Sequence, residues 1–137
     1  MTPGPRSLNL DAAYRAAHYR IDTEPPLILR IDELHPALRA LFPQGGIFLT
    51  ACNPHSRRLR PAANRRRLHA LQRAIEQQGW AWLPGLGLDP QGLWPAEPSL
   101  WIPSLPLDEG LRLARCFGQN ALVQCGPDAM ARLIWTG

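Results

Sequence analysis

The stretch that decides the fold is "GIFLTACNPHSRRLRPAANRRRLHALQRAIEQQG", residues 46–79. Its first seven residues are rich in β-forming side chains and are bounded by glycines and an Asn-Pro turn signal, which predicts a buried strand over 46–52. Further on, leucine and isoleucine recur at helical spacing over 65–78, with Asn64 placed to cap the helix and Gly79 placed to end it. The stretch therefore predicts a strand followed by an amphipathic helix.

The chain after this helix is expected to continue as strand, strand, helix and strand. The elements are a strand at 80–84, a Gly- and Pro-rich connection at 85–98, a strand at 99–103, a helix from Pro106 to Gly118 and a strand at 121–125. From residue 46 to 125 the order is that of the split βαβ, ferredoxin-like unit, βαββαβ. One extra strand is predicted at 132–136.

The chain before residue 46 is expected to add a helix-strand-helix extension. A helix is predicted over 8–21, with Asn9 as its cap, then a strand at 25–31 and a helix at 35–42. The first eight residues are expected to be loose. With 137 residues the chain matches the size of one domain, so we expect a single α+β domain over 1–137.

Composition excludes several classes of protein. No apolar run approaches the roughly 20 residues that cross a bilayer, so we expect a cytoplasmic protein without membrane contact. The 3 cysteines include no CxxC pair, and the 4 histidines have no ligand spacing, so neither a disulfide framework nor a metal is predicted. The sequence has no Walker or GxGxxG motif, and no cofactor is expected. Oligomeric state stays open.

Positive charge is concentrated in one patch. All 15 basic residues are arginines, and those from Arg57 to Arg73 are accompanied by no acidic residue. Such a patch is usually a solvated helix face. Arginines near the start of a helix are also suited to phosphate, because the free backbone N–H groups and the helix dipole attract anions there.

Polar residues should gather at one end of the sheet. If both crossovers of the βαββαβ unit are right-handed, the end of strand 46–52, the start of helix 65–78, the connection 85–98 and the joint after Gly118 lie together. The candidate ligand-binding residues at this end are Asn53, Ser56, Asn64, Arg65, Arg66, Arg67, Glu97, Gln119 and Asn120.

Glu97 is the most informative of these residues. A carboxylate among prolines and tryptophans either pairs with an arginine, for which Arg66 and Arg67 are candidates, or is a polar group of a pocket. Glu97 is also the weak candidate for a catalytic residue, as a general base. No serine, cysteine or threonine has a recognisable base beside it, so the question of enzymatic activity stays open.

Four motifs resemble one family over nearly the whole chain: "FLTACNPHS", "PAANRRR", "GLGLDPQGLWPAEPSL" and "LARCFGQNALV". Their order and spacing are similar to those of the uncharacterised bacterial family called domain of unknown function 3293. The resemblance implies no activity. The residues that match the family pattern are Asn53, Pro54, Ser56, Asn64, Trp94, Glu97, Ser99, Gly118, Gln119, Asn120 and Ala121.

Three functions are compatible with these patterns. The first is a site for a small anionic or phosphate-bearing ligand, in which Arg65, Arg66 and Arg67 hold the anion and the polar residues bind neutral groups. The second is a nucleic-acid-binding module that uses the patch from Arg57 to Arg73. The third is a structural or protein-interaction domain, whose polar residues only tie loops together.

Overall fold

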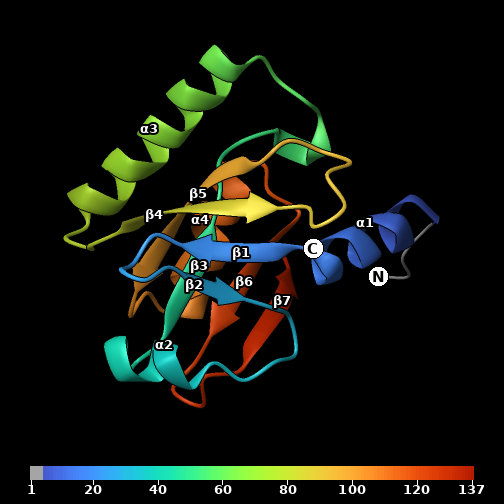
Figure 1. Cartoon of the computed structure of the whole chain (residues 1–137). Coiled ribbons are helices and arrows are strands. Elements are labelled where there is room, and N and C mark those ends of the chain that lie inside the picture. The colour runs from blue at the N-terminus through green and yellow to red at the C-terminus, as the bar shows by residue number, and fades with distance from the viewer. Residues whose placement is uncertain (1–4) are drawn as a thin grey trace.

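The computed structural model describes the backbone of residues 5–137 and the side chains of residues 10–137, and it is a mixed arrangement of four α-helices and seven strands. Figure 1 shows α3 and α4 against the sheet and α1 projecting from one end of it. The helices are α1 (Pro5–Ala16), α2 (Pro36–Leu41), α3 (Pro61–Gln77) and α4 (Leu107–Cys116). The strands are β1 (His18–Ile21), β2 (Leu27–Leu29), β3 (Gly46–Leu49), β4 (Leu83–Leu88), β5 (Glu97–Pro103), β6 (Ala121–Cys125) and β7 (Ala131–Trp135). A 3-10 turn, η1 (Pro54–Ser56), follows β3.

The strands form a single antiparallel sheet in the order β2-β1-β4-β5-β3-β6-β7. The segment that follows β2 hydrogen-bonds to the start of β7. The N–H group of Asp32 donates to the carbonyl of Ala131 at 2.8 Å, and that of His35 donates to Ala129 at 2.8 Å. The sheet therefore curls, because the segments next to its two edge strands, β2 and β7, are hydrogen-bonded to each other.

The curled sheet has an apolar core on each face. On one face, Leu71 and Ile75 of α3 and Leu113 of α4 pack against β3 and β5. The other face is concave and holds Tyr19, Phe48, Trp101 and Val123, among others, with Leu38 of α2 closing it. This second core continues to the end of the sheet where α1 lies, and so forms the floor of the candidate site.

One predicted boundary in the N-terminal extension is wrong, and one strand of the extension was not predicted. The helix expected over 8–21 ends at Ala16, and residues 18–21 are β1, which pairs with both β2 and β4. Pairing on both sides buries Tyr19 and Ile21, which outweighs the helical spacing of the apolar residues. The extension is therefore a helix, two strands and a helix.

The start of the chain also differs from expectation. Residues 5–8, expected to be loose, are helical, and Asn9 lies inside α1 instead of capping it. The expectation for residues 1–4 lies outside the described residues.

β4 is displaced from the strand predicted at 80–84, since it runs from Leu83 to Leu88. Glycine disfavours strands, so this segment reads as a loop in the sequence. Gly85 is required by packing here, because a Cβ atom on it would lie 2.5 Å from the carbonyl oxygen of Arg20 and 2.8 Å from the ring of Phe48. The glycine lets neighbouring strands and the core aromatic approach.

Candidate functional site

The polar residues predicted to converge do lie together at one end of the sheet. Asn53 follows β3, Asn64 is in α3, Glu97 begins β5 and Gln119 precedes β6. The N–H group of Asn53 donates to Oδ1 of Asn64 at 2.9 Å, and Nε2 of Gln119 donates to the carbonyl of Cys52 at 3.0 Å. Residues from four separate segments therefore meet.

Asn53 is the centre of this network. Its Oδ1 atom accepts hydrogen bonds from the N–H group of Leu59 at 2.9 Å and from Nδ2 of Asn64 at 2.8 Å. Its Nδ2 atom donates to Oε2 of Glu97 at 2.9 Å. One side chain thus joins the loop after β3, helix α3 and strand β5.

The loop that carries Asn53 has an unusual backbone. Asn53, His55 and Ser56 have positive φ angles of 49°, 55° and 60°. Non-glycine residues rarely adopt this left-handed conformation, which costs about 1–3 kcal/mol per residue and is concentrated at functional sites. The hydrogen bonds of Asn53 therefore hold a strained loop in place.

Gly118 allows this loop to pack against the end of α4. Its φ is +68°, and a Cβ atom on it would lie 2.9 Å from Cβ of Pro54 and 3.3 Å from Nε2 of His55. The N–H group of His55 donates to the carbonyl of Gly118 at 2.8 Å. Glycine is needed at this position for its conformation and for the close approach.

Glu97 is a half-buried carboxylate without an arginine partner among the described residues. Of the two alternatives for Glu97, the ion pair with Arg66 or Arg67 is therefore not formed, which leaves the position as a polar group of a pocket. Burial raises the pKa of the Glu97 carboxyl, and the hydrogen bond from Asn53, which favours the charged form, opposes that rise. Among the described residues, only Asn53 donates to the carboxylate, so Oε1 has no protein donor.

The three arginines predicted to hold an anion have separate surroundings. α3 begins at Pro61, so Asn64 is not its cap and these arginines lie beyond its first turn. Arg67 donates through Nε to the carbonyl of Ala51 at 2.7 Å and through Nη2 to that of Phe117. Arg66 lines a depression on the outer side of α3. Of the three arginines, only Arg65 lines a cavity beside Glu97.

Gln119 and Asn120 close the site on the side of β6. Nε2 of Gln119 also donates to the carbonyl of Phe117 at 3.2 Å. Nδ2 of Asn120 donates to Oγ of Ser56 at 2.9 Å, and that oxygen lies 3.2 Å from the hydroxyl of Tyr14. Gln119 and Asn120 therefore connect neighbouring loops, and both also line a cavity at this end of the sheet.

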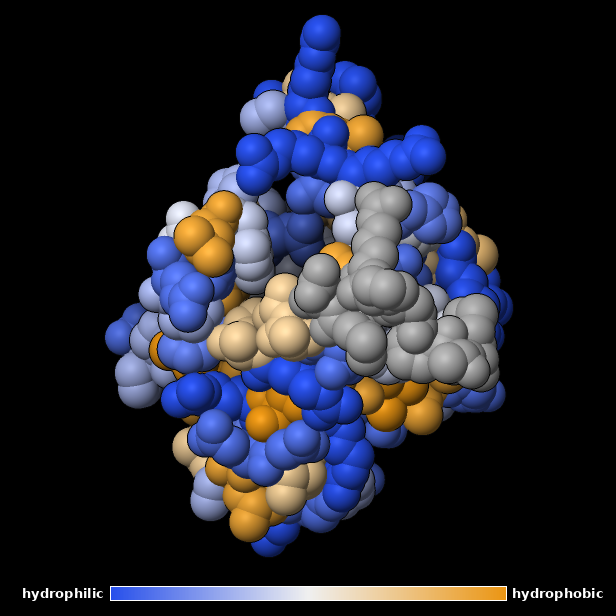
Figure 2. Space-filling view, turned by 90° about the vertical axis from the view of Figure 1, so that its right-hand side faces the viewer, coloured by the Kyte–Doolittle hydropathy of each residue, from blue (hydrophilic) through white to orange (hydrophobic). Residues whose placement is uncertain are grey.

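Besides a small cavity of about 60 Å³, Glu97 lines two larger, open cavities that meet there. The first has a volume of about 250 Å³ and is lined by residues of α1, η1, the 89–96 connection and the joint before β6. The second, of about 410 Å³, lies between α3 and the same connection. The residues that line both are Cys52, Asn53, Arg58, Pro95 and Glu97. Figure 2 faces the side from which α1 projects and shows a hollow among mostly hydrophilic residues.

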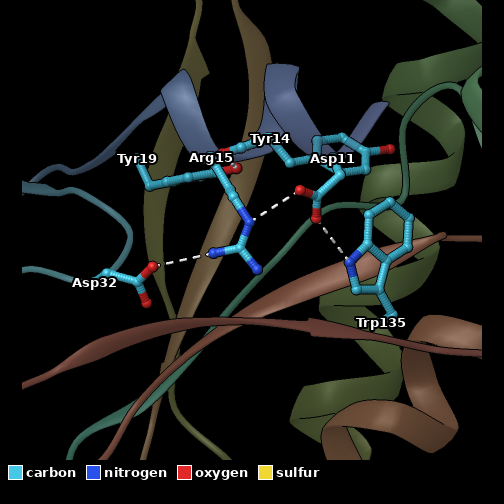
Figure 3. A network of polar contacts seen from close by, with 6 residues as sticks. All are labelled: Asp11, Tyr14, Arg15, Tyr19, Asp32 and Trp135. Atoms are coloured by element: carbon cyan, nitrogen blue, oxygen red, sulfur yellow. Dashed lines mark hydrogen bonds and ion pairs between the residues drawn. The ribbon is translucent and has the colours of Figure 1, made fainter. Parts of the chain in front are cut away.

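Helix α1 is fixed across this end of the sheet by a polar network, drawn in Figure 3. Oδ1 of Asp11 accepts a hydrogen bond from Nε1 of Trp135 at 3.2 Å, and its Oδ2 pairs with Arg15 at 3.0 Å. Arg15 also pairs with Asp32 at 3.0 Å. The network sets the position of Tyr14, whose ring packs at 5.5 Å from that of Trp135.

Of the residues that line the smaller of these two cavities and were not predicted site residues, three carry a charged or aromatic side chain: Tyr14, Arg58 and Trp94. Tyr14 was assigned to a helix without any link to the site, and Arg58 was one of seven arginines in the patch. The structural role of Arg67, which donates to two backbone carbonyls, could have been predicted from the sequence. Arg67 lies four residues before Leu71 and is therefore on the buried face of α3.

The described residues contain no group of three or more histidine, cysteine or acidic side chains that could hold a metal ion. Within the same residues, no helix has the length and apolar character that crossing a membrane requires.

The network of Asn53, Asn64, Glu97 and Gln119 falls inside one family match. A family model described as "Protein of unknown function (DUF3293)" matches residues 49–122, more than half of the chain. The chain belongs to this family. The DUF3293 match runs from the end of β3 to the start of β6, and so includes both cavities' shared residues but neither α1 nor β7. The comparisons with curated proteins and with solved structures found no match.

Proposed function

We propose that this DUF3293 protein binds a small phosphate-bearing ligand in the two cavities that meet at Glu97. The observation that carries the proposal is Arg58. This arginine lines both cavities and forms neither an ion pair nor a hydrogen bond with any described residue. A free guanidinium at the rim of a concave site suits a phosphate, which it can bind through two parallel hydrogen bonds.

Arg65 supports the same assignment from the other side. It is exposed on α3, lines the larger cavity, and has no ion-pair partner within the described part of the chain. The larger cavity, at about 410 Å³, lies within the range of about 300–1,000 Å³ that ligand pockets commonly enclose, and the smaller one, at about 250 Å³, adjoins it at Glu97. Polar side chains on strained but hydrogen-bonded loops supply a rigid frame.

The test is calorimetric titration of the protein with ribose 5-phosphate and with inorganic pyrophosphate at low salt. We expect saturable binding at one site, weakened at least about tenfold by Arg58→Ala, the loss expected for one charge-assisted contact. Arg73→Ala is the matched control, because Arg73 is an exposed arginine on the outer side of α3. Absence of binding, or an equal loss in Arg73→Ala, would contradict the proposal.

Nucleic-acid binding is the second candidate, and one observation favours it. The exposed arginines at 57, 58, 60, 65, 66 and 73 take part in no ion pair among the described residues. Binding to a phosphate backbone would weaken steeply with salt and would involve several of these arginines. Fluorescence anisotropy of labelled single-stranded RNA and duplex DNA at two salt concentrations separates this function from a pocket, which depends on Arg58 far more than on Arg73.

Two expectations about the whole protein remain proposals. We propose that β3 to β6 form a ferredoxin-like unit, which the order β4-β5-β3-β6 within the sheet supports. We propose a cytoplasmic location, for which the argument is the sequence composition alone. An experimental structure tests the ferredoxin-like unit, and cell fractionation tests the cytoplasmic location.

A further inference from the structure

Among the side chains that the structure describes, only Asn53 donates a hydrogen bond to the carboxylate of Glu97. Its Oε2 atom accepts one hydrogen bond, from Asn53, and no described residue donates to Oε1. No arginine, lysine or histidine within the described chain pairs with it. A half-buried carboxylate between two cavities is therefore matched by a ligand that brings N–H groups.

Two aromatic side chains line the cavity with this carboxylate. Tyr14 comes from α1 and Trp94 from the connection between β4 and β5. The ring of Tyr14 is held by Trp135, with the ring centroids 5.5 Å apart. Aromatic rings beside a polar group suit a planar heterocycle, because a base is stabilised by stacking on an aromatic ring.

We infer that the ligand is a mononucleotide whose base presents two adjacent N–H donors to Glu97, as the Watson–Crick edge of guanine does. This inference rests on the proposed function, because Arg58 takes the phosphate. A carboxylate accepts two parallel hydrogen bonds from such an edge, one to each oxygen. Hypoxanthine presents one of these donors, and ribose 5-phosphate presents neither.

The arrangement also explains why Asn53 bonds only one oxygen of Glu97. By donating to Oε2 it fixes the orientation of the carboxylate and leaves Oε1 to a ligand. The second lone pair of Oε2 stays available, since a carboxylate has about four acceptor positions. Asn53 is therefore a positioning residue for the base-reading group.

The experiment is calorimetric titration with guanosine monophosphate, inosine monophosphate and ribose 5-phosphate. We expect the guanosine compound to bind at least about tenfold more tightly than the other two, the discrimination of a good bidentate contact. Glu97→Gln should bring guanosine monophosphate down to the affinity of inosine monophosphate, because an amide offers one acceptor and places an N–H group against the second donor. Glu24→Gln, an exposed glutamate in the turn between β1 and β2, is the control that should change nothing.

The outcomes separate this inference from the proposed function. If the three compounds bind with equal affinity, the base is not read and the inference falls, while the phosphate site stands. If ribose 5-phosphate and both nucleotides fail to bind, the proposed function falls as well. Should Glu97→Gln not fold, the comparison of the two nucleotides on the wild-type protein still decides. Trp94→Leu should then weaken guanosine monophosphate more than ribose 5-phosphate, and an equal loss for both would overturn the stacking role.

Discussion

Nδ2 of Asn53 donates a hydrogen bond of 2.9 Å to Oε2 of Glu97, 44 positions further along the chain. The bond joins the loop after β3 to the first residue of β5. Because Asn64 bonds both the side chain and the backbone of Asn53, helix α3 belongs to the same unit. The stability of the loop after β3 and the protonation of the Glu97 carboxylate should therefore depend on one another.

Replacing Asn53 with alanine should lower the free energy of unfolding by about 3 kcal/mol. The N–H group of Leu59 and Nδ2 of Asn64, both half-buried, lose their acceptor, and a fully buried donor left unpaired costs about 1–3 kcal/mol. Urea denaturation measures the change. Asn53→Gly isolates the backbone contribution, because glycine adopts a φ of 49° freely, and it should be about 1 kcal/mol more stable than Asn53→Ala. A loss below about 0.5 kcal/mol in both variants would show that the network contributes little.

The raised pKa of Glu97 predicts a pH dependence of folding. The native carboxyl holds its proton at pH values where the unfolded chain has released it, so the native state binds more protons in that window. Its contribution to stability is therefore full below the ordinary pKa of about 4.5 and is lost as pH rises through the folded value. Urea denaturation from pH 4 to 8 should show this decline in the wild type and a smaller one in Glu97→Gln. Parallel curves for the two proteins would mean that the pKa is not raised.

Gly118→Ala should be clearly more destabilising than Gly92→Ala. Both glycines have φ near +70°, at 68° and 71°, so the backbone strain of about 1–2 kcal/mol is common to them. Only at Gly118 would the new Cβ meet an atom, Cβ of Pro54 at 2.9 Å, whereas nothing lies within 4 Å at Gly92. We expect an additional loss of about 1–3 kcal/mol for Gly118→Ala, measured by urea denaturation. Equal losses would show that η1 moves away from α4 at no cost.

Arg67→Ala should cost far more stability than Arg66→Ala. Arg67 supplies hydrogen bonds to the carbonyls of Ala51 and Phe117 and so joins the end of β3 to the end of α4. Hydrogen bonds from charged groups contribute about 1.5–3 kcal/mol, whereas an exposed arginine without a partner contributes within about 0.5 kcal/mol. Thermal and urea denaturation of the two variants provide the comparison. Similar stabilities would indicate that water replaces the guanidinium at both carbonyls.

The sequence by itself determined the meeting of the polar residues. An order of strand, helix, strand, strand, helix and strand brings the end of β3, the start of β5, the start of α3 and the joint before β6 to one side, because crossovers have a preferred hand. It also determined the outward direction of Arg66 and Arg73, since both lie away from the leucines of α3. These results depend on local periodicity and on general rules of connection, which a sequence carries.

Only the tertiary structure decided which of these residues are free to act. The local sequence pattern does not show that the chain changes from helix α1 to strand β1, because the strand conformation of β1 is stabilised by pairing with β2 and β4. Tyr14 reaches the cavity because Asp11 bonds Trp135, which is 124 positions away. No arginine with a described side chain pairs with Glu97, and the candidate partner Arg67 is engaged by two backbone carbonyls from distant segments. Hydrogen bonds between such segments depend on the position of whole elements, and that position is set by the packing of the core.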